Sequence, residues 1–140
     1  TTGRHVRDSP GAGAAGGLGA ALLALGARRE SGAHLIAEHT GTAGEIARCD
    51  LLITGEGRLD DQSVHGKVVG SLAALARTDG VPVLVLAGQV ALDQRALAAA
   101  GITAAHSLAD HVGSVQRAID DAAAQLTDLA FVTAGTLRME

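Results

Sequence analysis

The chain has 140 residues, of which 47% are hydrophobic, and its 11 basic and 15 acidic residues give a formal net charge of −4. This length suits one folded domain with its own core. The lack of a basic block, with a single aromatic residue, excludes the charged surface and stacking platforms of a nucleic-acid binder. No apolar run is long enough to suggest a membrane span, and the single Cys49 excludes an internal disulfide and favours a cytoplasmic location.

The first ten residues, Thr1–Pro10, are expected to lead into a single α/β unit over residues 11–140. A glycine-rich segment, Pro10–Gly19, follows, with leucines at helical spacing that stop at Gly26. Amides at such a helix start can bind phosphate or carboxylate, although close packing of a Gly/Ala helix explains the composition equally well. The candidate anion-binding glycines are Gly13, Gly16 and Gly17.

The same segment satisfies the spacing G-x-G-x-x-G at Gly11, Gly13 and Gly16, with Glu38 about 20 residues further on, as a dinucleotide-binding fingerprint requires. That fingerprint also needs a buried strand immediately before its first glycine. Residues 4–10 do not resemble one, so dinucleotide binding is kept as the alternative.

Short apolar runs alternate with helical patterns along the rest of the chain. This alternation predicts an α/β fold with a parallel sheet and helices on both faces. Three or four strands are few for an independent domain, so we expect an incomplete sheet whose missing strands come from outside this chain. The expected strands are Ala33–Ala37, Leu51–Thr54, Val83–Ala87 and Ile102–His106, and the expected helices are Thr42–Arg48, Lys67–Arg77, Asp93–Ala100 and a long one from His111.

The stretch Leu51–Lys67 holds most of the candidate chemistry. Gly55 and Gly57 are predicted to end its strand and to start a polar loop. Open α/β sheets bind ligands beyond the carboxyl ends of their strands, so this loop is a candidate active site. Its charged or titratable residues are Glu56, Arg58, Asp60, Asp61, His65 and Lys67.

These residue types suit phosphoryl transfer, which needs phosphate charge neutralised, a metal placed and an acceptor hydroxyl oriented. Lys67, at a predicted helix start, could face a phosphate, and the Arg58 fork could bind a carboxylate. Asp60 and Asp61 could hold Mg²⁺ through water or take the proton of the acceptor hydroxyl, and Glu56 could act as a second acid or metal ligand.

Each residue also has a structural explanation. Asp60 could cap a turn, Arg58 could pair with Asp61 on the surface, and His65 could donate to a carbonyl group. A P-loop is disfavoured, because Val68 stands where Ser or Thr should follow the lysine.

The segments PGAGAAGGLGAALLAL (10–25), DLLITGEGRLDDQSVHGK (50–67) and VPVLVLAG (81–88) resemble the C-terminal part of the glycerate kinase type 1 family. The resemblance implies a three-layer Rossmann-like or flavodoxin-like domain assembled from both ends of a longer chain, lacking its N-terminal strands here. It also implies phosphorylation of a hydroxyl of D-glycerate with ATP and Mg²⁺.

Carried onto this sequence, the cleft-facing motif of the family falls on Gly55–Arg58, Asp60 and His65–Lys67. The roles come from the residue chemistry above, which makes Arg58, Asp60 and Lys67 the candidate catalytic residues and Asp60 and Asp61 the candidate metal ligands. Glycerate is the expected partner, with no nucleic acid or membrane, and the chain is expected to form a homo-oligomer or to pair with a missing N-terminal half. A module that binds anions without kinase activity of its own stays open. The substrate- and phosphate-binding candidates are Gly55, Glu56, Gly57, His65 and Gly66, with the segment Gly11–Gly17 as a second wall.

Overall fold

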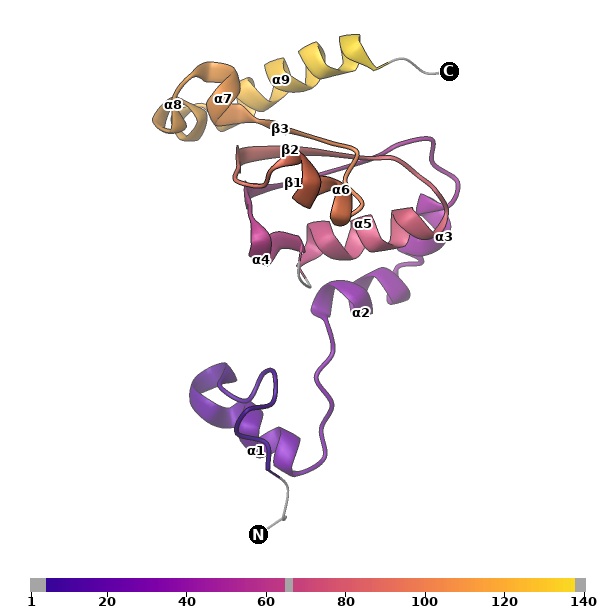
Figure 1. Cartoon of the computed structure of the whole chain (residues 1–140), viewed down its shortest axis with the longest axis vertical. Coiled ribbons are helices and arrows are strands. Elements are labelled where there is room, and N and C mark those ends of the chain that lie inside the picture. The colour runs from indigo at the N-terminus through magenta and orange to yellow at the C-terminus, as the bar shows by residue number, and fades with distance from the viewer. Residues whose placement is uncertain (1–4, 65–66, 138–140) are drawn as a thin grey trace.

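The structure is a computed structural model that describes residues 5–64 and 67–137. Within this part of the chain, β1 (Leu52–Leu59), β2 (Val83–Val90) and β3 (Ala104–Ser107) form one parallel sheet in the order β1-β2-β3. Figure 1 shows helices on both faces of the sheet, which confirms the predicted α/β architecture. The helical segments are η1 (Ala14–Gly17), α1 (Leu18–Ala24), α2 (Gly32–His39), α3 (Thr42–Ile46), α4 (Asp61–Val64), α5 (Val68–Thr78), α6 (Gln94–Ala99), α7 (Leu108–Val112), α8 (Val115–Asp120) and α9 (Ala122–Thr136).

The central strand β2 supplies side chains to a core on each side of the sheet. Val83, Val85 and Ala87 pack into the larger core with residues of α5 and α6. Leu86 packs against the smaller core, which is built from α7, α8 and α9. An almost continuous apolar run is typical of a parallel strand covered on both faces, as the sequence predicted for this segment.

Several helix starts follow from local side-chain hydrogen bonds. Asp93 caps α6 by accepting from the Ala96 N–H at 2.8 Å, and Ser107 caps α7 by accepting from the Asp110 N–H at 3.1 Å. Such caps satisfy amide groups that the first helical turn leaves without partners. None of the described helices is long and apolar enough to cross a lipid bilayer.

The predicted strand Ala33–Ala37 is wrong, because these residues lie in α2. The Ser31 hydroxyl accepts from the His34 N–H at 3.4 Å and caps this helix. A short apolar run fits either element, and here the preceding cap favours the helix.

Two other boundaries also differ from the prediction. Gly55 and Gly57 do not end β1, which continues to Leu59 because β2 runs alongside it as far as Val90. The long helix expected from His111 is divided into three segments. Its first break is at Gly113, which adopts φ +70°, a left-handed conformation that glycine accepts without steric cost.

Candidate active site

The carboxyl ends of all three strands border one polar cleft with a volume of about 190 Å³. Arg58 comes from β1, Gln89 from β2 and Ser107 from the end of β3, while Asp110 of α7 adds a carboxylate. This is the edge at which open α/β sheets bind ligands. The predicted place of the site therefore coincides with a cleft.

Arg58 is held at this edge by its neighbours. The sheet register sets Arg58 opposite Gln89, and Arg58 Nη1 donates to Gln89 Oε1 at 3.2 Å. Arg58 Nε lies 3.8 Å from Asp60 Oδ2, and 62% of the arginine side chain is exposed. The guanidinium is thus oriented by two neighbours and still has surface for an anionic ligand.

Asp60 caps the short helix α4. Its Oδ1 accepts from the Gln62 N–H at 3.0 Å and from the Ser63 N–H at 3.2 Å, and the Ser63 hydroxyl lies at 3.2 Å. Desolvation opposes ionisation, but the hydrogen bonds from Ser63 and Gln62, together with the charge of Lys67, hold the pKa of the Asp60 carboxyl below its usual value. Asp60 is therefore anionic and weakly basic.

Ser63 fixes the turn that carries Asp60. It is fully buried, its hydroxyl accepts from the Asp60 N–H at 3.2 Å, and the same hydroxyl lies 3.0 Å from Arg58 O, to which it can donate. This buried serine ties the end of β1 to α4. No sequence pattern had predicted this role for Ser63.

Lys67 completes a group of three charges at the end of β1. It lies exposed at the N-cap of α5, where its charge contributes to the lowered pKa of Asp60. The structure therefore pairs Arg58 with Asp60 and sets Lys67 near enough for its charge to act on Asp60. Asp61 is exposed in the first turn of α4, and the candidates His65 and Gly66 lie outside the described residues.

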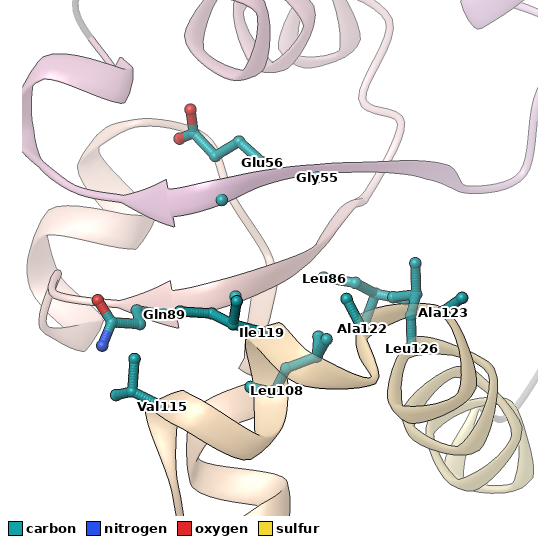
Figure 2. Close-up of a pocket in the computed structure, with 13 residues that line it drawn as sticks. Gly55, Glu56, Leu86, Gln89, Leu108, Val115, Ile119, Ala122, Ala123 and Leu126 are labelled. Atoms are coloured by element: carbon teal, nitrogen blue, oxygen red, sulfur yellow. The ribbon is translucent and has the colours of Figure 1, made fainter.

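Glu56 is placed differently from the other acidic candidates. Figure 2 shows its side chain on the side of β1 away from the labelled apolar residues. Its Oε1 atom is buried and has no hydrogen-bond partner among the residues that the structure describes. A shielded carboxylate oxygen without a donor is costly, so Glu56 is positioned to accept a hydrogen bond from a ligand group.

A larger cavity of about 760 Å³ lies on the other face of the sheet (Figure 2). Gly55, Gly57 and Gly88 leave its floor without side chains, and aliphatic residues of α7, α8 and α9 form its walls. It shares Gln89 and Val115 with the polar cleft. Gly55 and Gly57, which were predicted to bind substrate or phosphate, thus line an apolar cavity that adjoins the polar cleft.

The glycine-rich segment lies away from these charged residues in the structure. Figure 1 shows η1 and α1 away from the sheet, joined to α2 by an extended segment. A side chain on Gly19 would collide with the Gly11 carbonyl oxygen, so close packing accounts for the glycine at position 19. The structure does not bring Gly13, Gly16 and Gly17 to the charged residues, and their role as a second wall stays a prediction.

The dinucleotide-binding alternative lacks its structural context. Residues 7–13 form turns instead of the strand that the fingerprint requires. Glu38 lies inside α2 and not at the end of a second strand.

The acidic residues fit a magnesium ion only in a limited way. No group of three or more metal-ligating side chains occurs in residues 5–64 and 67–137. Asp60 Oδ1 already receives hydrogen bonds, which leaves Oδ2 as the oxygen directed towards Arg58. Mg²⁺ commonly binds one or two carboxylates and completes its shell with water and substrate phosphates. The site fits that mode and does not fit a cage made of protein ligands.

Gln89, Ser107 and Asp110 belong to the cleft, although the sequence analysis assigned none of them to the site. The signal that could have found Gln89 and Ser107 is their position within two residues of the end of a predicted parallel strand, whereas Asp110 is reached only through the first turn of α7. The rule that located Arg58 applies equally to the neighbouring strands.

Comparison with known proteins gives the same family as the motifs. The sequence profile described as the glycerate kinase family matches residues 1–138. The chain belongs to the glycerate kinase family. It is 58% identical over 135 residues to an uncharacterized protein of Mycobacterium bovis, a match that covers 96% of this chain and 35% of that protein.

Two further matches are a named enzyme and a solved structure. Glycerate 2-kinase of Escherichia coli is 43% identical over 114 residues, which cover 81% of this chain and 30% of that enzyme. A crystal structure from Salmonella typhimurium LT2, described as a proposed glycerate kinase 2, matches with a TM-score of 0.55 and 34% identity, over 89% of this chain and 33% of that one. The chain thus spans about a third of the length of these glycerate kinase relatives.

Proposed function

We propose that this chain contributes the charged edge of a site that transfers a phosphoryl group from ATP to a hydroxyl of D-glycerate. The observation that carries the proposal is the Arg58–Asp60 pair at the carboxyl end of β1, with the charge of Lys67 acting on Asp60. Membership of the glycerate kinase family supports the choice of reaction.

Arg58 and Lys67 are the groups that bind anions in this proposal. The guanidinium, oriented by Gln89, presents its free N–H groups to the carboxylate of glycerate in a forked geometry. The ammonium of Lys67, at the start of α5, neutralises phosphate oxygens as negative charge moves during transfer.

In this proposal Asp60 is an anionic ligand and a positioning group, and it does not act as a strong base. Hydrogen bonds that stabilise its charged form make it a weak acceptor of the substrate proton. Phosphoryl transfer passes through a loose transition state and needs little help from a base. When bound, Mg²⁺ would neutralise phosphate charge, and Asp60 Oδ2 is the described oxygen best placed to hold it, directly or through water.

A chimera tests the proposal. This chain would replace the 114 aligned residues of E. coli glycerate 2-kinase, and ADP release would be measured with ATP, Mg²⁺ and D-glycerate. We expect D-glycerate-dependent turnover that falls by at least about 100-fold in each of Arg58→Ala, Asp60→Asn and Lys67→Ala. Glu38→Gln on exposed α2 is the matched charge-removing control and should keep full activity.

Circular dichroism of each chimera separates loss of chemistry from loss of fold. Turnover that survives all three substitutions in folded chimeras would contradict the proposal. Binding of Mg·ATP to the unaltered 140-residue chain, measured by calorimetry, gives a second readout. If the chain binds ATP and the folded chimera has no turnover, the silent anion-binding module is the better description.

A further inference from the structure

We propose that the apolar cavity of about 760 Å³ between the sheet and the helices α8 and α9 binds the adenine base of ATP. The inference rests on the proposed function, to which it adds a place for the base. The charged residues at the end of β1 account for the phosphates and the carboxylate and leave the base without a site.

The first observation is a glycine that the fold does not require. Gly57 lies inside β1 without a left-handed φ, and a Cβ atom there would meet no described atom within 4 Å. Close packing of the strands explains the neighbouring glycines, because a Cβ on Gly55 would lie 2.2 Å from Leu86 O. A Cβ on Gly88 would lie 2.5 Å from Gly57 O. Glycine weakens a strand and often marks the close approach of a ligand, and Gly57 lines the cavity.

The second observation is the size and the lining of the cavity. Its volume lies within the range of roughly 300–1,000 Å³ that is typical of small-molecule sites. Glu56 is the one charged residue among the described residues that line it, and its side chain points to the other side of β1 (Figure 2). A triphosphate or a carboxylate would lose its hydration in this cavity without gaining a counter-charge. A flat, uncharged base is the part of the substrates that suits it. The aliphatic walls are formed by Leu108, Val115, Ile119 and Leu126.

The third observation is that the cavity continues into the polar cleft. Gln89 and Val115 line both spaces. Arg58 Nη1 donates to Gln89 Oε1 at 3.2 Å, so the amide nitrogen of Gln89 remains to donate to a ring nitrogen of the base. In Figure 2 this nitrogen lies on the side of Val115. A nucleotide with its base in the cavity therefore has its phosphates directed to the charged edge of the sheet.

The lining favours adenine over guanine. Guanine carries a carbonyl oxygen and a ring N–H that adenine lacks. Each additional polar group that is buried against aliphatic side chains without a partner lowers the affinity. Gln89 is the one uncharged polar side chain among the described lining residues, so the cavity can satisfy few such groups. We therefore expect ATP to be preferred over GTP.

Nuclear magnetic resonance on the 140-residue chain tests the location. Adenosine is the probe, because it carries the base without phosphates and its binding does not depend on phosphoryl transfer. We expect nuclear Overhauser effects between the H2 and H8 protons of adenosine and the methyl groups of Leu86, Ile119 and Leu126. Contacts of adenosine with other parts of the chain alone, or no binding up to its solubility limit, would overturn the proposal.

Substitution of Gly57 tests the role of the missing side chain. Gly57→Leu places a side chain in the cavity, and it should weaken adenosine binding to the chain by at least roughly tenfold. In the chimera it should raise KM for ATP by a similar factor and leave KM for D-glycerate unchanged. Gly44→Leu on α3 is the matched control, because a Cβ there also meets no described atom within 4 Å and Gly44 lies outside the cavity. It should change neither constant.

A second variant keeps the test valid if Gly57→Leu does not fold, which circular dichroism would show. Ile119 is 65% exposed on the opposite wall, so Ile119→Asp should fold and weaken adenosine binding by placing a charge against the base. Ile36→Asp on α2 is its control, since Ile36 is also 65% exposed and lies outside the cavity. Adenosine binding that is insensitive to both cavity substitutions would overturn the proposal.

The results separate this inference from the proposed function. If the folded chimera has no turnover, the proposed function fails, while adenosine contacts in the cavity that Gly57→Leu weakens still support a site for the base. If turnover depends on the charged residues as proposed and a folded Gly57→Leu chimera keeps its KM for ATP, the inference fails and the proposed function stands.

Discussion

At the scale of single residues, the side chain of Asp60 serves both the local fold and the proposed chemistry. Asp60 holds the first turn of α4 through Oδ1, and its Oδ2 lies near Arg58. A loss of activity after substitution would therefore be ambiguous unless the cap is preserved. Asparagine preserves it, because its side-chain oxygen caps helices as well as that of aspartate and carries no charge.

We predict that Asp60→Asn, which keeps the capping oxygen and loses the charge, lowers the thermal midpoint slightly at neutral pH, while Asp60→Ala lowers it more. Because the pKa of Asp60 is below its usual value of 3.8 in the folded chain, its charge stabilises the fold fully above that value. The contribution is lost as pH falls through the folded pKa, so the wild type should lose stability in acid more steeply than Asp60→Asn. Urea unfolding at pH 7 and at a series of pH values below 4 measures this, and parallel curves would contradict the interpretation.

Arg58 makes a separate residue-scale prediction about geometry. Arg58→Lys keeps the positive charge and loses the planar fork that can bind Gln89 and a carboxylate together. In the chimera we expect KM for D-glycerate to rise by roughly tenfold, about 1.4 kcal/mol, with a smaller change in KM for ATP. Gln89→Ala is the matched variant that removes the orienting partner, and it should give a smaller rise of the same kind. An equal rise in KM for ATP would indicate that Arg58 binds the phosphates instead of the carboxylate.

At the scale of elements, sequence reasoning succeeded where a local pattern was supported by its tertiary setting. The continuous apolar run of β2 predicted a doubly covered strand, and Asp93 before an Ala-rich segment predicted α6. It failed at β1, whose glycines look like a strand end. The pairing with β2, which carries the strand through Gly55 and Gly57 to Leu59, is a contact between distant parts of the sequence and leaves no local signal.

The paired glycines of β1 and β2 give an element-scale prediction with its own control. A Cβ atom on Gly88 would lie 2.5 Å from Gly57 O, so Gly88→Ala must separate the two strands. We expect it to lower the free energy of unfolding by roughly 1–3 kcal/mol, as overpacking does. A Cβ on Gly57 would meet no atom within 4 Å, so Gly57→Ala should change stability little. Chemical denaturation of both variants measures this difference. Equal losses in the free energy of unfolding would show that the flexibility of glycine, and not the close approach of the strands, explains the glycine at position 88.

At the scale of the whole molecule, the sequence predicted the layers of the fold and the location of the charged residues. It did not predict which residues of the neighbouring strands and helices line the cleft beside them. Arg58 and Asp60 pair, and Lys67 follows at the start of α5, because a strand, a turn and a helix follow one another closely along the chain. The cleft also needs Ser107 and Asp110, which reach it through the order of strands in the sheet. That order is set by packing over the whole sheet, and the chain's own patterns did not specify it.

The separation of the glycine-rich segment from the sheet leads to a prediction for the whole chain. Because η1 and α1 lie away from the sheet (Figure 1) and neither core contains a residue of the described range 5–26, deletion of residues 1–26 should remove no described contact from either core. We expect the thermal midpoint of the remaining chain to change by less than about 2 °C. A much larger fall would mean that the segment packs on the sheet in solution.

The same deletion also tests the predicted second wall of the site. If Gly13, Gly16 and Gly17 contact phosphate, the affinity for Mg·ATP must drop although the stability does not. Unchanged affinity would assign these glycines to packing alone and leave anion binding to Arg58 and Lys67.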